Sequence, residues 1–262
     1  MTLAVITIGI DPFIHLGPVT LAWHGITIAI GIAVGGLLAS RDVKRRGMSA
    51  EPIQTIIALT AVGGIVGAKI LYIVESGGLA RPDEWLGTNG FTFAGGLILG
   101  AALVIGYVVR ARLDPLYIDI AAAALPLGVA VGRIGDVING EHYGDRTDFF
   151  LGVRNSHPDA TVPDHAAAYH SGGLYEVLLS LLIFAVVWPR RDRLGHPTSV
   201  AWIVLAMFGA GRFFEFFLRS DDGNSAVGLT VSQWSCVAIV VASAVGWEWS
   251  RRRFASRVSY TT

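Results

Sequence analysis

Long runs of hydrophobic residues, separated by short polar stretches, dominate the pattern of this chain. A helix needs roughly 20 mainly apolar residues to cross about 30 Å of hydrocarbon. The runs are continuous and do not alternate with a period of two, so we expect helices and no sheet of four or more strands. Seven runs are long enough, at about 19–40, 52–74, 91–110, 116–138, 172–189, 198–218 and 230–249. The pattern therefore predicts an all-α integral membrane protein with seven transmembrane helices.

The basic residues fall mainly in alternate connections between these runs. Thirteen of the 20 lysines and arginines follow the first, third, fifth and seventh runs: Arg41, Lys44, Arg45, Arg46, Arg110, Arg112, Arg190, Arg191, Arg193, Arg251, Arg252, Arg253 and Arg257. The other side carries four: Arg81, Arg146, Arg154 and Arg219. Because cytoplasmic loops carry the excess of Lys and Arg, we expect an external N-terminus and a cytoplasmic C-terminus. This arrangement requires an odd number of spans, and seven satisfies it.

The composition agrees with a membrane protein and excludes several functions. Only 15% of the residues are charged, whereas a soluble domain usually has about 25%. The formal net charge is zero, so we expect no nucleic-acid partner, which would require a basic excess. The single cysteine, Cys236, excludes an internal disulfide and a cysteine-based metal cluster. The histidines show no regular spacing, so we expect no metal site.

One connection, at about 139–171, is much longer than the others. In the expected orientation it is external, and its length predicts a functional cap over the end of the helices. We find no internal repeat, so residues 1–262 are expected to form a single domain. Glycines four residues apart predict close packing between helices, in the pairs Gly31 and Gly35, Gly63 and Gly67, Gly96 and Gly100, and Gly128 and Gly132.

Polar residues from several predicted helices converge near the external end. Ionisable groups at membrane depth are costly and usually face a partner or a polar cavity. The expected orientation places the following residues at this level: His24, Lys69, Ala94, Gly95, Gly96, Arg133, Asp136, Asn139, Glu141, Glu176 and Arg212. The cations could simply snorkel to the headgroups or pair within their own helices. Arg133 and Arg212 could also hold one phosphate between their guanidinium groups.

A sequence motif at the end of the fourth run is more specific. It resembles the signature of the bacterial prolipoprotein diacylglyceryl transferases, in the run Gly132-Arg133-Ile134-Gly135-Asp136-Val137-Ile138-Asn139-Gly140-Glu141-His142-Tyr143-Gly144. Further similarity lies in Trp23-His24-Gly25, Gly67-Ala68-Lys69, Gly95-Gly96-Leu97, Tyr175-Glu176, Gly211-Arg212-Phe213-Phe214-Glu215-Phe216 with Arg219, and Leu229-Thr230-Val231-Ser232-Gln233. The resemblance covers most of the chain, with the motifs in order.

The resemblance implies a reaction and a location. Family members move the diacylglyceryl group of phosphatidylglycerol to the lipobox cysteine of a preprolipoprotein signal peptide, and glycerol phosphate leaves. It implies a multi-pass protein of the bacterial cytoplasmic membrane that needs no cofactor or metal. The implied catalytic residues are Arg133, Arg212, Glu141 and His24. The implied substrate-binding residues are Arg133, Asp136, Asn139, Gly140, Gly144, Gly95, Gly96, Glu176 and Glu215.

The chain departs from the family pattern at three places. Ala94 stands where the family usually has a histidine before the paired glycines, and His24 stands where it has a tyrosine. Asp136-Val137 replaces an Asn-Phe pair. Alanine cannot accept a proton, so His24 or His142 would have to act as the base. Alternatively, the chain is a phospholipid-binding relative whose transfer activity is altered or lost. A small-solute transporter is less consistent, because the spans show no inverted repeat.

Overall fold

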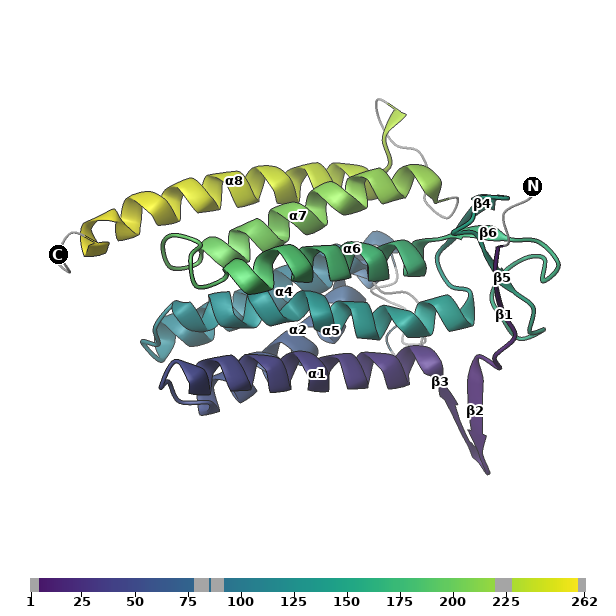
Figure 1. Ribbon diagram of the computed structural model, residues 1–262, viewed down its shortest axis with the longest axis horizontal. Helices are drawn as coiled ribbons and strands as arrows, with labels where there is room; N and C mark the ends of the chain where they lie inside the picture. Colours follow the sequence, from purple (N-terminus) through teal and green to yellow (C-terminus); the bar gives the residue numbers. More distant parts are fainter. Residues whose placement is uncertain (1–4, 78–84, 86–91, 220–227, 259–262) are drawn as a thin grey trace. The chain divides into compact units, whose positions relative to one another are not determined.

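The computed structural model describes residues 5–77, 85, 92–219 and 228–258 (Figure 1). These residues form two compact units, one of Met1–Leu37 with Ala122–Thr262 and one of Leu38–Ala121. Arg81, which the sequence analysis counted on the sparsely basic side, lies outside the described residues. Each unit is built mainly from helices.

Seven apolar helices lie where the hydrophobic runs predicted them. They are α1 (Trp23–Arg45), α2 (Glu51–Glu75), α4 (Phe93–Arg110), α5 (Leu116–Asn139), α6 (Gly172–Val187), α7 (Ser199–Glu215) and α8 (Val231–Val258). Among the described residues, six helices are long and apolar enough to cross a membrane, and the α4 region contributes a shorter apolar helix, Gly95–Arg110. Short 3-10 turns, η2 (Trp188–Arg190) and η3 (Phe216–Leu218), extend α6 and α7. The chain is thus a mostly helical, multi-pass membrane protein.

The prediction of an all-α chain with no sheet of four or more strands was wrong. A four-stranded sheet, in the order β1-β5-β6-β4, is formed by β1 (Ile6–Ile8), β4 (Tyr143–Arg146), β5 (Val153–Asn155) and β6 (Tyr169–Ser171). Strands of three or four residues are too short to leave a detectable alternation in the sequence. Their pairing is also non-local, because β1 pairs in parallel with β5.

The start of the first helix also differs from the prediction. The hydrophobic run begins near residue 19, but Val19–Ala22 forms strand β3, which pairs with β2 (Phe13–Leu16) in an antiparallel hairpin. Gly17 has a φ of +62° in the connecting turn, a conformation that glycine adopts without steric cost. Helix α1 therefore begins only at Trp23.

Residues 139–171, predicted as one long cap loop, are built around strands β4 to β6. A small apolar cluster fills this segment, with Ala160, Val162 and Tyr169 buried against Tyr143 and Ala167. The aromatic rings of Tyr143 and Tyr169 meet edge to face, 5.6 Å apart at their centroids. Arg146 and Asp164 form an ion pair at the surface, 2.8 Å between Nη2 and Oδ2.

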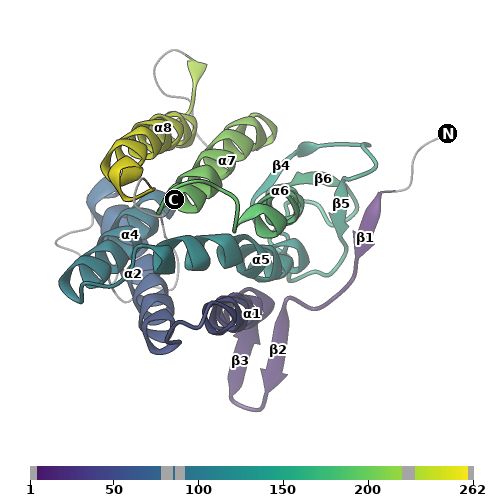
Figure 2. The ribbon, with the colours of Figure 1, turned by 60° about the vertical axis from the view of Figure 1, so that its left-hand side comes forward.

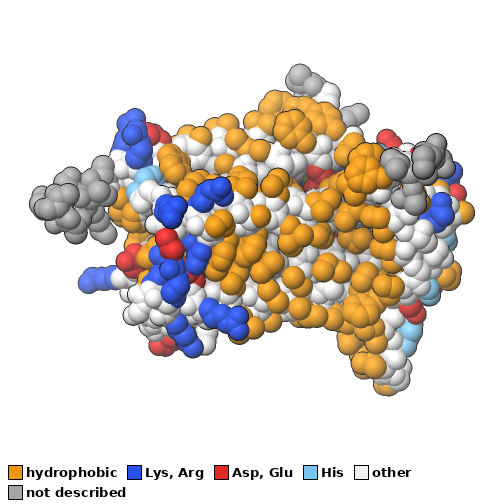
Figure 3. Space-filling view, in the orientation of Figure 1, with side chains coloured by type: hydrophobic (Ala, Val, Ile, Leu, Met, Phe, Trp, Pro, Cys, Tyr) orange, Lys and Arg blue, Asp and Glu red, His pale blue; other side chains and the backbone are white. Residues whose placement is uncertain are grey.

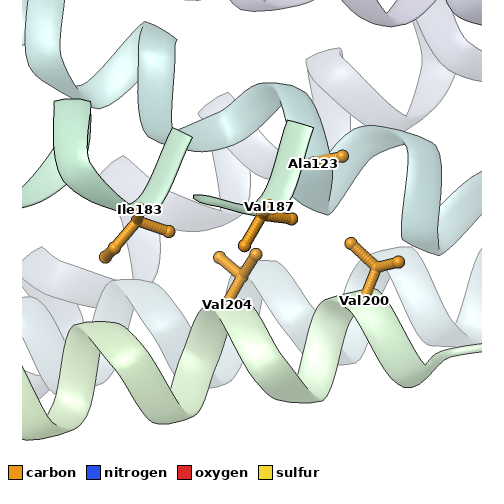
Figure 4. Close-up of a cluster of buried hydrophobic side chains, with 5 residues drawn as sticks. All are labelled: Ala123, Ile183, Val187, Val200 and Val204. Atoms are coloured by element: carbon orange, nitrogen blue, oxygen red, sulfur yellow. The ribbon is translucent and has the colours of Figure 1, made fainter. Parts of the chain in front are cut away.

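Apolar side chains hold the helices of the first unit together. Figure 4 shows Ile183 and Val187 of α6 meeting Val200 and Val204 of α7, beside Ala123 of α5. Figure 3 shows hydrophobic side chains along the visible faces of α1, α6 and α7, as expected for helices that contact lipid. Basic residues follow α6 and lie in the last turns of α8, at the end of these helices away from the sheet.

The predicted glycine contacts between helices are confirmed. A Cβ atom at Gly128 of α5 would lie 2.8 Å from the carbonyl oxygen of Gly31 on α1. In the second unit, a Cβ atom at Gly63 of α2 would lie 2.8 Å from the Cα of Gly100 on α4. Such distances are too short for any side chain, so these helix pairs require glycine for their close approach.

Candidate active site

The last two turns of α5 and the residues just after them position the polar residues of the motif. Arg133 and Asp136 form an ion pair through Nη1 and Oδ2, as their i,i+3 spacing predicts. The helix ends because Gly140 adopts a φ of +71° and the amide of Glu141 donates to the carbonyl of Asp136, 3.0 Å away. Gly140, predicted to bind substrate, therefore has a direct structural role: it turns the chain so that Glu141 follows closely on the helix.

The first turn of α1 lies directly against this end of α5. His24 Nδ1 contacts Asp136 Oδ1 and lies 3.3 Å from Glu141 Oε2. The hydroxyl of Thr27 donates to the carbonyl of Gly132 (2.7 Å) and accepts from the amide of Gly135 (3.1 Å). These bonds tie the two helices together at the level of His24.

Helix α6 brings a carboxylate to both arginines. Glu176, which is 3% exposed, contacts Arg133 Nε through Oε2 and Arg212 Nη1 through Oε1. Gly173 permits this approach, since a Cβ there would lie 3.0 Å from the Cβ of Asp136. Arg133 of α5 and Arg212 of α7 are therefore held on the two sides of one buried carboxylate.

A second group of charges surrounds the end of α7. Glu215 is buried, and its Oε1 lies 3.7 Å from Arg219 Nη1. Neither carboxylate oxygen of Glu215 accepts a hydrogen bond from the described residues. Arg219 Nη2 lies 3.1 Å from His142 Nδ1, and His142 Nε2 lies 3.9 Å from Asp136 Oδ2. His142 thus connects this group to the His24 and Asp136 pair.

Asn139 and Gly144 also lie at this end of the first unit. The side-chain amide of Asn139 donates to Glu141 Oε1 (3.0 Å), and its Oδ1 is buried without a partner among the described residues. Gly144 pairs with Arg219 through an isolated β-bridge, so close that the space of a Cβ is taken by the carbonyl of Leu218. The structure thus accounts for the glycine at 144 by backbone packing.

The remaining predicted residues belong to the second unit. Gly95 and Gly96 pack against α2, where a Cβ at Gly96 would lie 2.7 Å from the carbonyl oxygen of Gly64. Ala94 lies in the first turn of α4, and its side chain is outside the described residues. Lys69 is 8% exposed, with Nζ 5.6 Å from the centroid of the Tyr72 ring, so this lysine is buried in protein and does not extend to the surface. A substrate-binding role for Gly95 and Gly96 stays a prediction.

The site can bind an anion and move a proton. Guanidinium groups of Arg133 and Arg212 offer planar sets of donors that match phosphate oxygens. When His24 Nδ1 donates to Asp136 Oδ1, Nε2 is the ring nitrogen that can accept a proton.

His24, Asp136 and Glu141 also present ligand atoms within 4.8 Å of one another. A metal ion there would take the place of the hydrogen bond between His24 Nδ1 and Asp136 Oδ1.

The structure adds three residues that the sequence analysis did not assign to the site. Thr27 joins α1 to α5, and Arg219 contacts both Glu215 and His142. Asn155 of β5 donates from Nδ2 to the carbonyls of Val137 (2.9 Å) and Ile138 (3.0 Å), satisfying the end of α5. Thr27 follows His24 by three residues and could have been found by its helical spacing. Asn155 carries no such local signal.

Comparisons with known proteins show which family the chain belongs to. The family model described as prolipoprotein diacylglyceryl transferase matches residues 12–249. A phosphatidylglycerol–prolipoprotein diacylglyceryl transferase of Streptococcus agalactiae serotype Ia is 32% identical over 254 residues, covering 94% of this chain and 97% of the relative. The protein of the same name from Paracidovorax citrulli is 28% identical over 267 residues, covering 93% and 97%. The chain therefore belongs to the prolipoprotein diacylglyceryl transferase family.

Proposed function

We propose that this chain transfers the diacylglyceryl group of phosphatidylglycerol to the lipobox cysteine thiol of a preprolipoprotein, and releases glycerol phosphate. Family membership and the names of the relatives support this reaction. The observation that carries it is the contact of Arg133 and Arg212, from different helices, with opposite oxygens of the buried Glu176. We infer that two guanidinium groups that share one carboxylate can also share one phosphate.

The arginines act on the leaving group. The phosphodiester of phosphatidylglycerol carries one negative charge, and the departing glycerol phosphate carries an additional one when the C–O bond breaks. Fixed cations beside that phosphate stabilise the developing charge more than the starting lipid, which lowers the barrier. Glu215, whose two oxygens are buried and accept no hydrogen bond from the described residues, is the proposed acceptor for a headgroup hydroxyl. Asn139 and Glu141 orient the same headgroup.

His24 is the proposed general base. A thiol with a pKa near 8.5 must lose its proton to become a good nucleophile. With Nδ1 facing Asp136 and Glu141, Nε2 is the ring nitrogen that we propose accepts the proton of the thiol. The proton moves from sulfur to Nε2, the thiolate forms an S–C bond with the diacylglyceryl carbon, and the C–O electron pair leaves with the phosphate. Atoms and charges balance without a cofactor.

The location of the site follows from the charge pattern. We infer seven spans with the N-terminus and the cap on the external side of a bacterial cytoplasmic membrane and the C-terminus in the cytoplasm. This orientation is supported by the basic residues after α6 and in the last turns of α8. It places the arginines near the outer leaflet, where an exported signal peptide and phosphatidylglycerol are both present. We also infer that both compact units work together as one transferase domain.

Lipidation of a synthetic lipobox peptide by membranes that contain the protein tests this function. The wild-type chain is expected to form the thioether product with phosphatidylglycerol. Replacing either guanidinium, in Arg133→Ala or Arg212→Ala, is expected to lower the rate at least about 10²-fold, as the loss of one charge-stabilising donor typically does. His24→Gln is expected to lower it by about 10²–10⁴-fold, the usual contribution of a general base.

Arg146→Ala is the matched control, because the Arg146 side chain is 66% exposed on the cap and forms its ion pair with Asp164 at the surface. This variant should react like the wild type.

Complementation of a transferase-deficient strain, with the natural chain and with Ala94→His, is a second test. Rescue by Ala94→His alone would show that the natural chain is an altered or inactive phospholipid-binding relative. Full activity in His24→Gln would exclude His24 as the base.

A further inference from the structure

The β2–β3 hairpin has two chemically different faces. Its register pairs Ile14 with Leu21 and Leu16 with Val19, and side chains at these paired positions share one face of a hairpin. The opposite face carries the pairs Phe13 with Ala22 and His15 with Thr20. On that second face His15 Nδ1 and Thr20 Oγ1 are 3.3 Å apart. Near its turn the hairpin is therefore amphipathic, with four aliphatic side chains on the apolar face and His15 and Thr20 on the other.

Most of the apolar face is exposed. The exposed fraction is 59% for Leu16, 50% for Val19 and 41% for Leu21. Exposed aliphatic clusters on an isolated two-stranded hairpin are unfavourable in water, and such hairpins are marginally stable without a surface to pack on. The apolar face therefore requires an apolar environment.

The connection to α1 identifies that environment. Strand β3 ends at Ala22 and α1 begins at Trp23, with no residue between them. The amide of Trp23 donates to the carbonyl of Pro12 (3.1 Å), which joins both ends of the hairpin to the start of the helix. Because α1 is a candidate membrane span, the hairpin is held where this span meets the surface of the bilayer.

The direction of the hairpin fits that surface. Figures 1 and 2 show it running sideways from the end of α1, away from α5 and α6. In Figure 3 hydrophobic side chains gather on the side of the hairpin turned toward the helices. A strand pair that lies across the end of a membrane-spanning helix runs along the bilayer plane. The apolar side faces the hydrocarbon, and the polar side faces water.

We propose that the β2–β3 hairpin is a lateral membrane anchor whose apolar face, Ile14, Leu16, Val19 and Leu21, lies in the interfacial layer of the leaflet at which α1 begins. The free edges of a two-stranded hairpin expose backbone amides and carbonyls, which need water or headgroups, so the hairpin stays at the interface and does not enter the hydrocarbon. Trp23 lies at the same boundary, where tryptophan is enriched. The anchor fixes the depth of the first turn of α1, and so of His24.

Fluorescent labelling of the full-length protein in phosphatidylglycerol and phosphatidylcholine vesicles tests this proposal. A Cys236→Ser chain removes the native thiol, and single cysteines are then introduced as Leu16→Cys or Leu21→Cys on the apolar face and Thr20→Cys on the polar face. We expect an environment-sensitive dye at position 16 or 21 to emit at shorter wavelength. Lipids with a spin label near the headgroup should quench it several-fold more than the dye at position 20. Aqueous iodide should give the reverse order.

Three results would overturn the anchor. Equal iodide quenching on both faces would place the hairpin in water. Shielding of position 16 only after a lipobox peptide is added would make the apolar face a peptide-binding surface. Disulfide-linked dimers of Leu16→Cys that increase with protein density would make it a contact between two copies. Leu16 and Leu21 are both exposed and are labelled in separate variants. A folding defect in one variant therefore does not decide the outcome.

Discussion

Of the single carboxylate-to-amide substitutions that the structure suggests, Glu176→Gln should destabilise the protein most. Glu176 contacts Arg133 and Arg212, whose side chains are 22% and 8% exposed, and is itself 4% exposed. Glutamine keeps the shape of the side chain but removes the charge that both guanidinium groups face. Removing one partner of a buried ion pair typically costs about 3–5 kcal/mol. Arg133 keeps its ion pair with Asp136, so the loss of compensating charge falls mainly on Arg212.

The expected shift is measurable as thermal unfolding in detergent at a fixed scan rate. At about 2–4 °C per kcal/mol for a chain of this size, a loss of that magnitude lowers the apparent Tm by roughly 6–20 °C. Inorganic phosphate should raise the Tm of Glu176→Gln more than that of the wild type, since an anion can replace the missing charge. A general packing defect would not produce this second effect.

Glu248→Gln is a closely matched control. Glu248 also contacts two arginines, Arg251 and Arg252, by i,i+3 and i,i+4 spacing. These arginines are 62% and 79% exposed, so the loss of the charge should change the Tm little. If Glu176→Gln unfolds at the same temperature as Glu248→Gln, the carboxylate does not hold the arginine pair, and the basis of the proposed phosphate site is wrong.

Two further predictions concern the junction of α1 and α5. Gly135→Ala should lower the Tm and the lipidation rate, because a Cβ there would lie 2.6 Å from the Cα of His24 and overpacking of this kind costs about 1–3 kcal/mol. Gly25→Ala is its control, since nothing lies within 4 Å of a Cβ at that position, and equal unfolding of the two variants would contradict the close approach. Thr27→Val should cost about 1–3 kcal/mol because the buried hydrogen bonds of the Thr27 hydroxyl with the carbonyl of Gly132 and the amide of Gly135 are lost. Thr27→Ser should retain most of the stability, and a Thr27→Val chain as stable as Thr27→Ser would show that the hydroxyl bonds are unimportant.

The sequence alone was sufficient for the features that depend on neighbouring residues. Hydrophobic runs of about 20 residues identified every apolar helix, although α8 continues nine residues beyond its predicted end. The cost of exposing backbone in lipid leaves few alternatives to a helix. The ion pair of Arg133 with Asp136 followed from spacing on one helix. The glycine pairs predicted close helix contacts, which GxxxG-type spacing produces wherever two backbones meet.

Contacts between distant segments were decided only by the tertiary structure. His24 and Asp136 are separated by 112 residues, and Glu176 reaches Arg212 across 36 residues. The sequence placed these groups at one level of the membrane but gave no information on which side chains would touch. The pairing of β1 with β5, and the strand at Val19–Ala22 within a hydrophobic run, likewise depend on a partner strand. Local sequence determines helices because their hydrogen bonds are local, whereas sheets and charge clusters depend on which distant segments the packing brings together.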